Sequence, residues 1–99
     1  MVEIIWEFQV DHSHVVEFEN NYGPEGAWVS LFKQSEHYYG TALLKDNVNS
    51  SLYLTIDKWE SLEAFEEFKK QHLNLYHSLD LVCEKLTLAE KKIGIFEVI

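Results

Sequence analysis

The feature that most constrains the fold of this chain is a change of hydrophobic period at Trp59. Before it, every second residue is apolar, as in a β-strand with one buried face, at Leu52, Leu54 and Ile56. After it, the spacing lengthens to three residues, as on an amphipathic helix, at Leu62, Phe65 and Phe68. Ser61 stands where a helix N-cap belongs, because its side-chain oxygen can accept a backbone N–H of the first turn. The sequence therefore predicts a strand that runs directly into a helix, with Trp59 as the anchor at the joint.

Composition and charge limit the functions that are open to the chain. It has 99 residues, enough for one domain with a core, and 46% of them are hydrophobic. A net charge of −9 repels phosphate backbones and anionic lipids, which argues against nucleic-acid and membrane-surface roles. Cys83 is the only cysteine, so an internal disulfide is excluded and a reducing, cytoplasmic location is expected. The first residues show no basic-then-apolar leader, and no apolar run is long enough for a membrane span.

The order of the predicted elements indicates an α+β fold. Strands are expected at 1–10, 37–45, 52–57 and 93–99, and helices at 15–22, 25–34, 62–68 and 75–86, with one helical turn at 87–90. Gly40, inside a strand, indicates either a bulge or a close approach by another group. Strand, helix, strand, strand, helix, strand is the split βαβ order of ferredoxin-like folds, with an antiparallel four-stranded sheet covered by helices on one face. The chain has no repeats or linker, so we predict a single domain over residues 1–99.

Apolar residues also fall on the sheet face that should lie away from the helices. We interpret Leu52, Leu54 and Ile56 as the buried face of their strand, which places Tyr53 on the other face together with Ile5 of the first strand. The segment 93–99 is apolar as well. A small sheet with a second apolar face hides that face most readily against a symmetric copy, so we predict a homodimer.

The residues around Trp59 resemble a known family. The run from Tyr53 to Phe65 is similar to the strand-to-helix signature of the antibiotic biosynthesis monooxygenase (ABM) superfamily: an apolar strand, Trp, one residue, Ser, and a helix that carries Phe. Residues 26–32, residues 39–44 and the region of Tyr76 also resemble that family, so the similarity spans most of the chain. It implies a dimeric α+β barrel, with a pocket in each subunit between the sheet and its covering helices.

The resemblance also implies a chemistry. Cofactor-independent monooxygenases of this family oxidise electron-rich phenols or quinols by letting the substrate's own carbanion react with oxygen, which requires a dry aromatic cavity and a group that moves a proton. The catalytic candidates are His77, His37 and Tyr39. The candidates for substrate binding are the aromatic residues Trp28, Phe32, Phe65, Phe68 and Tyr76. Because aromatics at helical spacing are also typical of a core, the alternative is a non-catalytic dimeric module that binds a small ligand.

Haem chemistry fits the sequence less well. Haem-degrading members of the superfamily carry an asparagine on the first strand, a tryptophan in the helix after the conserved Trp, and a histidine further on. Here residues 4–8 contain no asparagine, Phe68 stands at about the tryptophan position, and only His77 has a counterpart. We therefore rank haem degradation or haem binding below a generic small-molecule pocket, and we expect no cofactor.

Two further features have a structural and a functional interpretation. His12 and His14 beside Asp11 have a spacing that could bind a metal, but no further ligand follows nearby. A polar turn between strand and helix is favoured, with Asp11 or Ser13 as the N-cap, and no metal site is expected. Cys83 lies on an apolar flank without a basic neighbour, which indicates an inert buried thiol.

Overall fold

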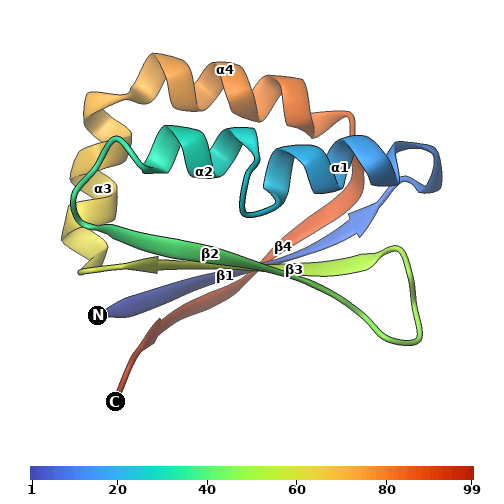
Figure 1. Cartoon of the computed structure of the whole chain (residues 1–99), viewed down its shortest axis with the longest axis horizontal. Coiled ribbons are helices and arrows are strands. Elements are labelled where there is room, and N and C mark those ends of the chain that lie inside the picture. The colour runs from blue at the N-terminus through green and yellow to red at the C-terminus, as the bar shows by residue number, and fades with distance from the viewer.

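The computed structural model describes all 99 residues, which form a sheet with helices on one of its faces (Figure 1). The elements, in chain order, are β1 (Val2–Val10), the short 3-10 helix η1 (His12–His14), α1 (Val15–Tyr22), α2 (Ala27–Phe32), β2 (Tyr38–Lys45), β3 (Leu52–Trp59), α3 (Leu62–Gln71), α4 (Leu73–Glu84) and β4 (Thr87–Glu97). The strands pair antiparallel in the order β2-β3-β1-β4. The predicted α+β, ferredoxin-like arrangement is therefore confirmed.

The junction at Trp59 has the structure that the sequence predicts. Trp59 ends β3 with 0% of its surface exposed, and its indole packs against the rings of Phe32 and Phe65 at centroid distances of 5.4 and 5.3 Å. Ser61 caps α3, because its Oγ accepts the backbone N–H of Ala64 at 3.1 Å. The Trp59 side chain thus joins strand, helix and core at one point, as expected of an anchor.

The faces of β3 are opposite to those predicted. Tyr53, Thr55 and Trp59 are 1%, 4% and 0% exposed and lie under the helices, whereas Leu52, Leu54 and Ile56 are only partly buried on the other face. The physical reason is parity: side chains alternate along a strand, so residues 53, 55 and 57 share the face of Trp59. Both faces of β3 carry apolar residues, so hydrophobicity alone does not determine which face is buried. The large indole of Trp59 determines it, because Trp59 is buried under the helices.

The C-terminal strand begins earlier than predicted. The segment 87–90 is the start of β4, not a helical turn, and β4 ends at Glu97. β4 begins directly after α4. Its first residue, Thr87, already pairs with Val10 of β1, and the backbone N–H of Asp11 donates to Leu86 O just before it. Residues 87–90 form backbone hydrogen bonds with β1, and a local sequence pattern does not reveal such pairing with a distant strand.

The spacing of Leu75, Leu79, Val82 and Leu86 predicts the core-facing stripe of α4, and the observed stripe is shifted from it. Leu75 and Val82 are each 55% exposed, while Cys83 is buried at 1% and Tyr76 and Leu79 pack against the core. The stripe therefore runs through Tyr76, Leu79 and Cys83, which turns Tyr76 towards the sheet. The buried thiol of Cys83 agrees with the predicted inert role.

No helix covers the second face of the sheet (Figure 1). The strand register places six apolar side chains together there: Ile5, Ala42, Leu44, Leu54, Ile56 and Phe96. Leu44 is 47% exposed and Phe96 is 49% exposed. We call these six residues the open face. No helix of the molecule is long and apolar enough to cross a membrane.

Candidate functional site

A cavity of about 170 Å³ lies between the inner face of the sheet and the helices. Each of the four strands and each of the four α-helices contributes to its wall. The lining residues are Trp6, Phe8, Tyr22, Trp28, Phe32, Thr41, Thr55, Asp57, Lys69, Tyr76, Asp80 and Glu90. Six of them are hydrophobic and the other six are polar or charged, so the cavity combines apolar walls with several separate polar groups.

The aromatic side chains of the wall come from β1, α1, α2 and α4. Trp28 contacts the ring of Tyr76 edge-on at a centroid distance of 5.0 Å and that of Tyr22 at 6.1 Å. Trp28 is only 8% exposed, and its buried indole Nε1 has no hydrogen-bond partner. The Nε1 of Trp59 in the core is likewise unpaired, and both atoms are sealed from solvent by the surrounding side chains.

A chain of three hydroxyl and carboxyl groups enters the cavity from β2 and β3. Thr41 and Asp57 are register partners on neighbouring strands, and Thr41 Oγ1 donates to Asp57 Oδ1 at 2.6 Å. Because the single hydroxyl proton of Thr41 is committed to Asp57, the Tyr38 hydroxyl is the donor in its 2.5 Å contact with Thr41 Oγ1. The chain therefore runs from Tyr38 through Thr41 to Asp57, and Asp57 Oδ2 is left without a protein hydrogen bond.

Burial changes the acidity of this carboxyl group. Desolvation raises the pKa of Asp57 from 3.8 to about 6, against the opposing effect of the hydrogen bond from Thr41. Desolvation also raises the pKa of Tyr38, so its phenol stays protonated and remains a donor. A carboxylate with a pKa near 6 is ionised at neutral pH and still basic enough to take a proton from a bound molecule.

A second polar region of the cavity lies at α4 and β4. Asp80 and Glu90 line it, and no cationic side chain lies within ion-pairing distance of either carboxylate. Burial, with the charges of Asp80 and Glu84, raises the pKa of Glu90. Lys69 is the only cation in the wall, and its Nζ lies 4.7 Å from the centre of the Tyr76 ring.

Three of the five predicted binding residues, Trp28, Phe32 and Tyr76, line the cavity. Phe65 and Phe68 instead pack around Trp59, each with its ring 5.3 Å from the indole, and are part of the core behind Phe32. Phe68, 3% exposed, stacks on His72 at 4.3 Å.

The structure does not bring His77, His37 and Tyr39 to this cavity. His77 is exposed on α4, and Tyr39 is 53% exposed at the register shift beside Gly40, where the predicted bulge occurs. His37 is exposed and its Nδ1 lies 2.7 Å from Glu60 Oε2. The polar groups in the cavity are other residues.

Sequence reasoning missed Asp57 and Thr41. Asp57 was placed on the outer face of β3, and that error in strand face concealed its position. The signal that could have found it is its parity with Trp59: an acidic residue two positions before a buried tryptophan shares the buried face. Thr41 becomes meaningful only once its register opposite Asp57 is known.

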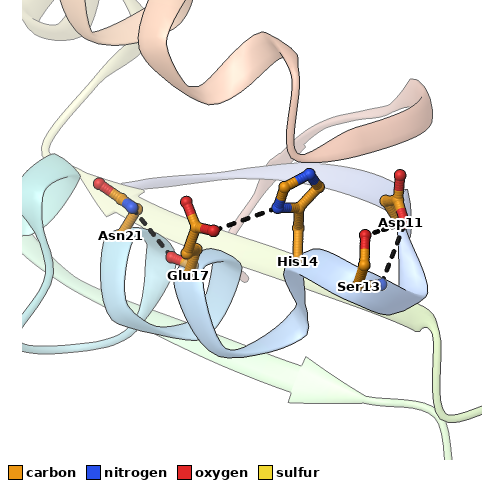
Figure 2. A network of polar contacts seen from close by, with 5 residues as sticks. All are labelled: Asp11, Ser13, His14, Glu17 and Asn21. Atoms are coloured by element: carbon orange, nitrogen blue, oxygen red, sulfur yellow. Dashed lines mark hydrogen bonds and ion pairs between the residues drawn. The ribbon is translucent and has the colours of Figure 1, made fainter.

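The segment with two histidines is a polar turn (Figure 2). Asp11 caps η1, since its Oδ1 accepts from the backbone N–H of Ser13 at 3.0 Å and from the Ser13 hydroxyl at 2.8 Å. His14 Nδ1 lies 3.1 Å from Glu17 Oε1. Of the two predicted candidates, Asp11 is the cap of η1, whereas the N-cap of α1 itself is His14, whose side chain makes no capping hydrogen bond. No group of three or more His, Cys, Asp or Glu side chains in the molecule is placed to hold a metal ion.

Comparison with known proteins identifies the fold. No model of a protein family matches the sequence, and no curated protein matches it. Among solved structures, SnoaB, a cofactor-independent oxygenase from Streptomyces nogalater, is 23% identical with a TM-score of 0.76, over 98% of this chain and 91% of SnoaB. A protein from Bordetella bronchiseptica that is provisionally assigned as an antibiotic biosynthesis monooxygenase is 13% identical with a TM-score of 0.80, over 99% of this chain and 96% of the other. The resemblance to ABM proteins is thus confirmed at the level of the fold.

Proposed function

We propose that this protein with the ABM fold is a cofactor-independent monooxygenase of small phenols or quinols. The observation that carries the proposal is Asp57: a carboxylate with a pKa near 6, oriented by Thr41, in the wall of a cavity half of whose lining residues are aromatic. Oxygenation without a cofactor needs a base that creates an electron-rich anion and a site that keeps bulk water away. Support from outside the chain is the shared fold with SnoaB, a cofactor-independent oxygenase.

The size of the cavity restricts the substrate to about one aromatic ring. A cavity of about 150 Å³ in another protein accommodates benzene. The volume of about 170 Å³ here leaves room for one ring with short substituents. Rings of this size contact Phe8, Trp28 and Tyr76 of the wall, which supplies the apolar part of the binding energy.

In the proposed reaction, Asp57 first takes the proton of the phenolic hydroxyl. The resulting anion transfers electron density from a ring carbon to O₂, and a carbon–oxygen bond forms to give a ring hydroperoxide. Cleavage of the O–O bond leaves one oxygen atom on the ring as a carbonyl and releases the other as water, with protonated Asp57 returning its proton. The balance is one phenol and one O₂ to one quinone and one water, so the substrate supplies all the electrons.

The neighbouring polar groups support these proton transfers. Thr41 fixes Oδ1 of Asp57 and directs Oδ2 to the substrate, while Tyr38 fixes the hydroxyl of Thr41. Lys69, as the only cation in the wall, balances the negative charge that develops on the substrate oxygen. His77, His37 and Tyr39 have no part in this scheme because they lie outside the cavity.

We also propose that the protein forms a homodimer through the open face. Apolar side chains such as Ile5, Leu54 and Ile56 lie on a sheet surface that no helix covers. An uncovered sheet face that groups apolar side chains in this way is typical of an interface between copies of a chain.

Oxygen consumption with single-ring phenols and quinols tests the proposed activity. We expect the protein, with a metal chelator present, to consume O₂ faster than the background oxidation of the compound. Asp57→Asn should lower the rate by about 10²–10⁴-fold, the usual contribution of a positioned base. Glu66→Gln, an equivalent change on the exposed side of α3, should leave the rate unchanged.

Two outcomes would overturn the proposal. No uptake across a broad panel would favour the non-catalytic ligand-binding module. Loss of activity in His77→Ala together with full activity in Asp57→Asn would assign the proton transfer to the histidine that sequence analysis selected.

A further inference from the structure

We infer that the substrate of this site carries a protonated amine in addition to its ring hydroxyl, which makes it a hydroxylated aromatic amine. The inference rests on the proposed function, because it assigns the second polar region of the same cavity. That region contains Asp80 and Glu90, two carboxylates that the proposed oxygenation leaves without a role.

The first argument is the unbalanced charge of the wall. Three carboxylates, those of Asp57, Asp80 and Glu90, face one ammonium, that of Lys69. Asp80 and Glu90 make no ion pair, and desolvation, together with the charges of Asp80 and Glu84, raises the pKa of Glu90. Both side chains are exposed and carry like charges at one end of the cavity, so a cation bound between them would be attracted by both. A ligand with a second negative charge would be repelled.

The second argument is the aromatic wall beside these carboxylates. The faces of Tyr, Trp and Phe rings attract ammonium groups within about 6 Å. The cavity already shows this preference, because the Lys69 ammonium lies 4.7 Å from the centre of the Tyr76 ring. Tyr22 and Trp28 provide further rings in the same wall. Carboxylates combined with aromatic faces form a recognition site for an organic cation.

A metal ion fits this region poorly. No three His, Cys, Asp or Glu side chains of the molecule are close enough together to coordinate one. Rings take the positions where a metal would require oxygen or nitrogen donors. The expected cation is therefore an alkylammonium group, which tolerates apolar neighbours better than a hydrated metal ion does.

The third argument is that the cavity is built for a molecule with two polar ends. Asp57 is the register partner of Ile4 in β1, and Glu90 is the partner of Phe8, four residues further along. Four residues of strand span roughly 13 Å, so the two carboxylates approach the cavity from opposite ends. One ring with a short aminoalkyl chain bridges such ends.

Three para-substituted phenols of different charge test the inference by binding, without turnover. They are tyramine (a cation), 4-ethylphenol (neutral) and 3-(4-hydroxyphenyl)propionate (an anion), titrated by calorimetry under nitrogen. We expect tyramine to bind about tenfold more tightly than 4-ethylphenol, since a cation–π contact and a counter-ion together contribute this much. The anion should bind most weakly, and added salt should reduce the preference for tyramine.

Variants locate the cation. The double change Asp80→Asn and Glu90→Gln should reduce the affinity for tyramine to that for 4-ethylphenol and leave 4-ethylphenol unchanged. That second readout shows that the cavity is still folded. Glu66→Gln is the matched control and should change neither affinity.

Equal affinity for the cation and the neutral probe, or tightest binding of the anion, would overturn the inference, as would the absence of binding by all three. The outcome is separable from that of the proposed function. Selective binding of tyramine without oxygen consumption would support the amine site and refute the monooxygenase. Oxygen consumption by a protein that binds the three probes without regard to charge would support the monooxygenase and refute the amine site.

Discussion

At the scale of single residues, the behaviour of Asp57 follows from where its strand places it. The same carboxylate on the other face of β3 would be an ordinary surface group. On the inner face it loses water, and its pKa rises to about 6. Thr41 compensates only part of this loss with one hydrogen bond. A group retained in such an unfavourable position is characteristic of a functional site.

The stability of the protein should report this burial directly. The pKa of Asp57 is raised on folding from 3.8 to about 6, so the folded state binds the proton more tightly and stability is lost as the pH rises through this range. The full difference corresponds to roughly 3 kcal/mol. We therefore expect Asp57→Asn to be about 1–3 kcal/mol more stable than the wild type at pH 7, and similar to it near pH 4.

Urea unfolding at several pH values measures this gap. Glu66→Gln, on the exposed face of α3, should show no comparable change with pH. An Asp57→Asn variant that is less stable than the wild type at every pH would mean that the carboxylate is stabilised, not strained, by its surroundings.

At the scale of elements, the junction of β3 with α3 shows how much local sequence determines. The change of period, the Ser61 cap and the Trp59 anchor were all predictable, because each depends on residues near to one another in the chain. The start of β4 and the buried face of β3 were not, because pairing with β1 and the position of the indole determine them. The same limit applies to the candidate site. Its aromatic residues were partly predicted, but the positions of its polar residues follow from strand register and helix rotation, which local sequence does not show. These residues are Asp57, Thr41, Asp80 and Glu90.

Ser61→Ala tests the cap at this junction. The change removes the acceptor for the Ala64 N–H, and we expect it to lower the free energy of unfolding by about 1 kcal/mol. Ser78→Ala, at an exposed interior position of α4, should be neutral or slightly stabilising because alanine favours the helix. Chemical denaturation of both variants provides the measurement. Equal stability of the two variants would show that the hydrogen bond contributes nothing.

At the scale of the whole molecule, the two faces of the sheet have different roles. The inner face and the helices enclose the core and the cavity, whereas the open face presents apolar residues from all four strands. The dimer prediction was argued from Ile5, Tyr53 and the apolar segment 93–99. Tyr53 proved to be buried at 1%, and Leu54, Ile56 and Phe96 now take its place in the argument.

A charge in the centre of the open face should prevent assembly. Size exclusion with light scattering should give twice the chain mass of 11.7 kDa for the wild type. Ile56→Asp would leave an unpaired charge in the interface, so we expect dissociation to be favoured by at least about 100-fold. Leu75→Asp, at a 55% exposed position of α4, should remain dimeric. A monomeric wild type would contradict the proposal.

The central claim is that Asp57 and an aromatic cavity suffice for oxygenation of a phenol, and isotope labelling tests it most directly. The metal-free protein is incubated with a single-ring phenolic substrate under ¹⁸O₂, and the product is analysed by mass spectrometry. The account predicts one ¹⁸O atom in each quinone molecule, with Asp57→Asn forming almost none. A product whose new oxygen is unlabelled, or equal labelling by Asp57→Asn, would contradict it.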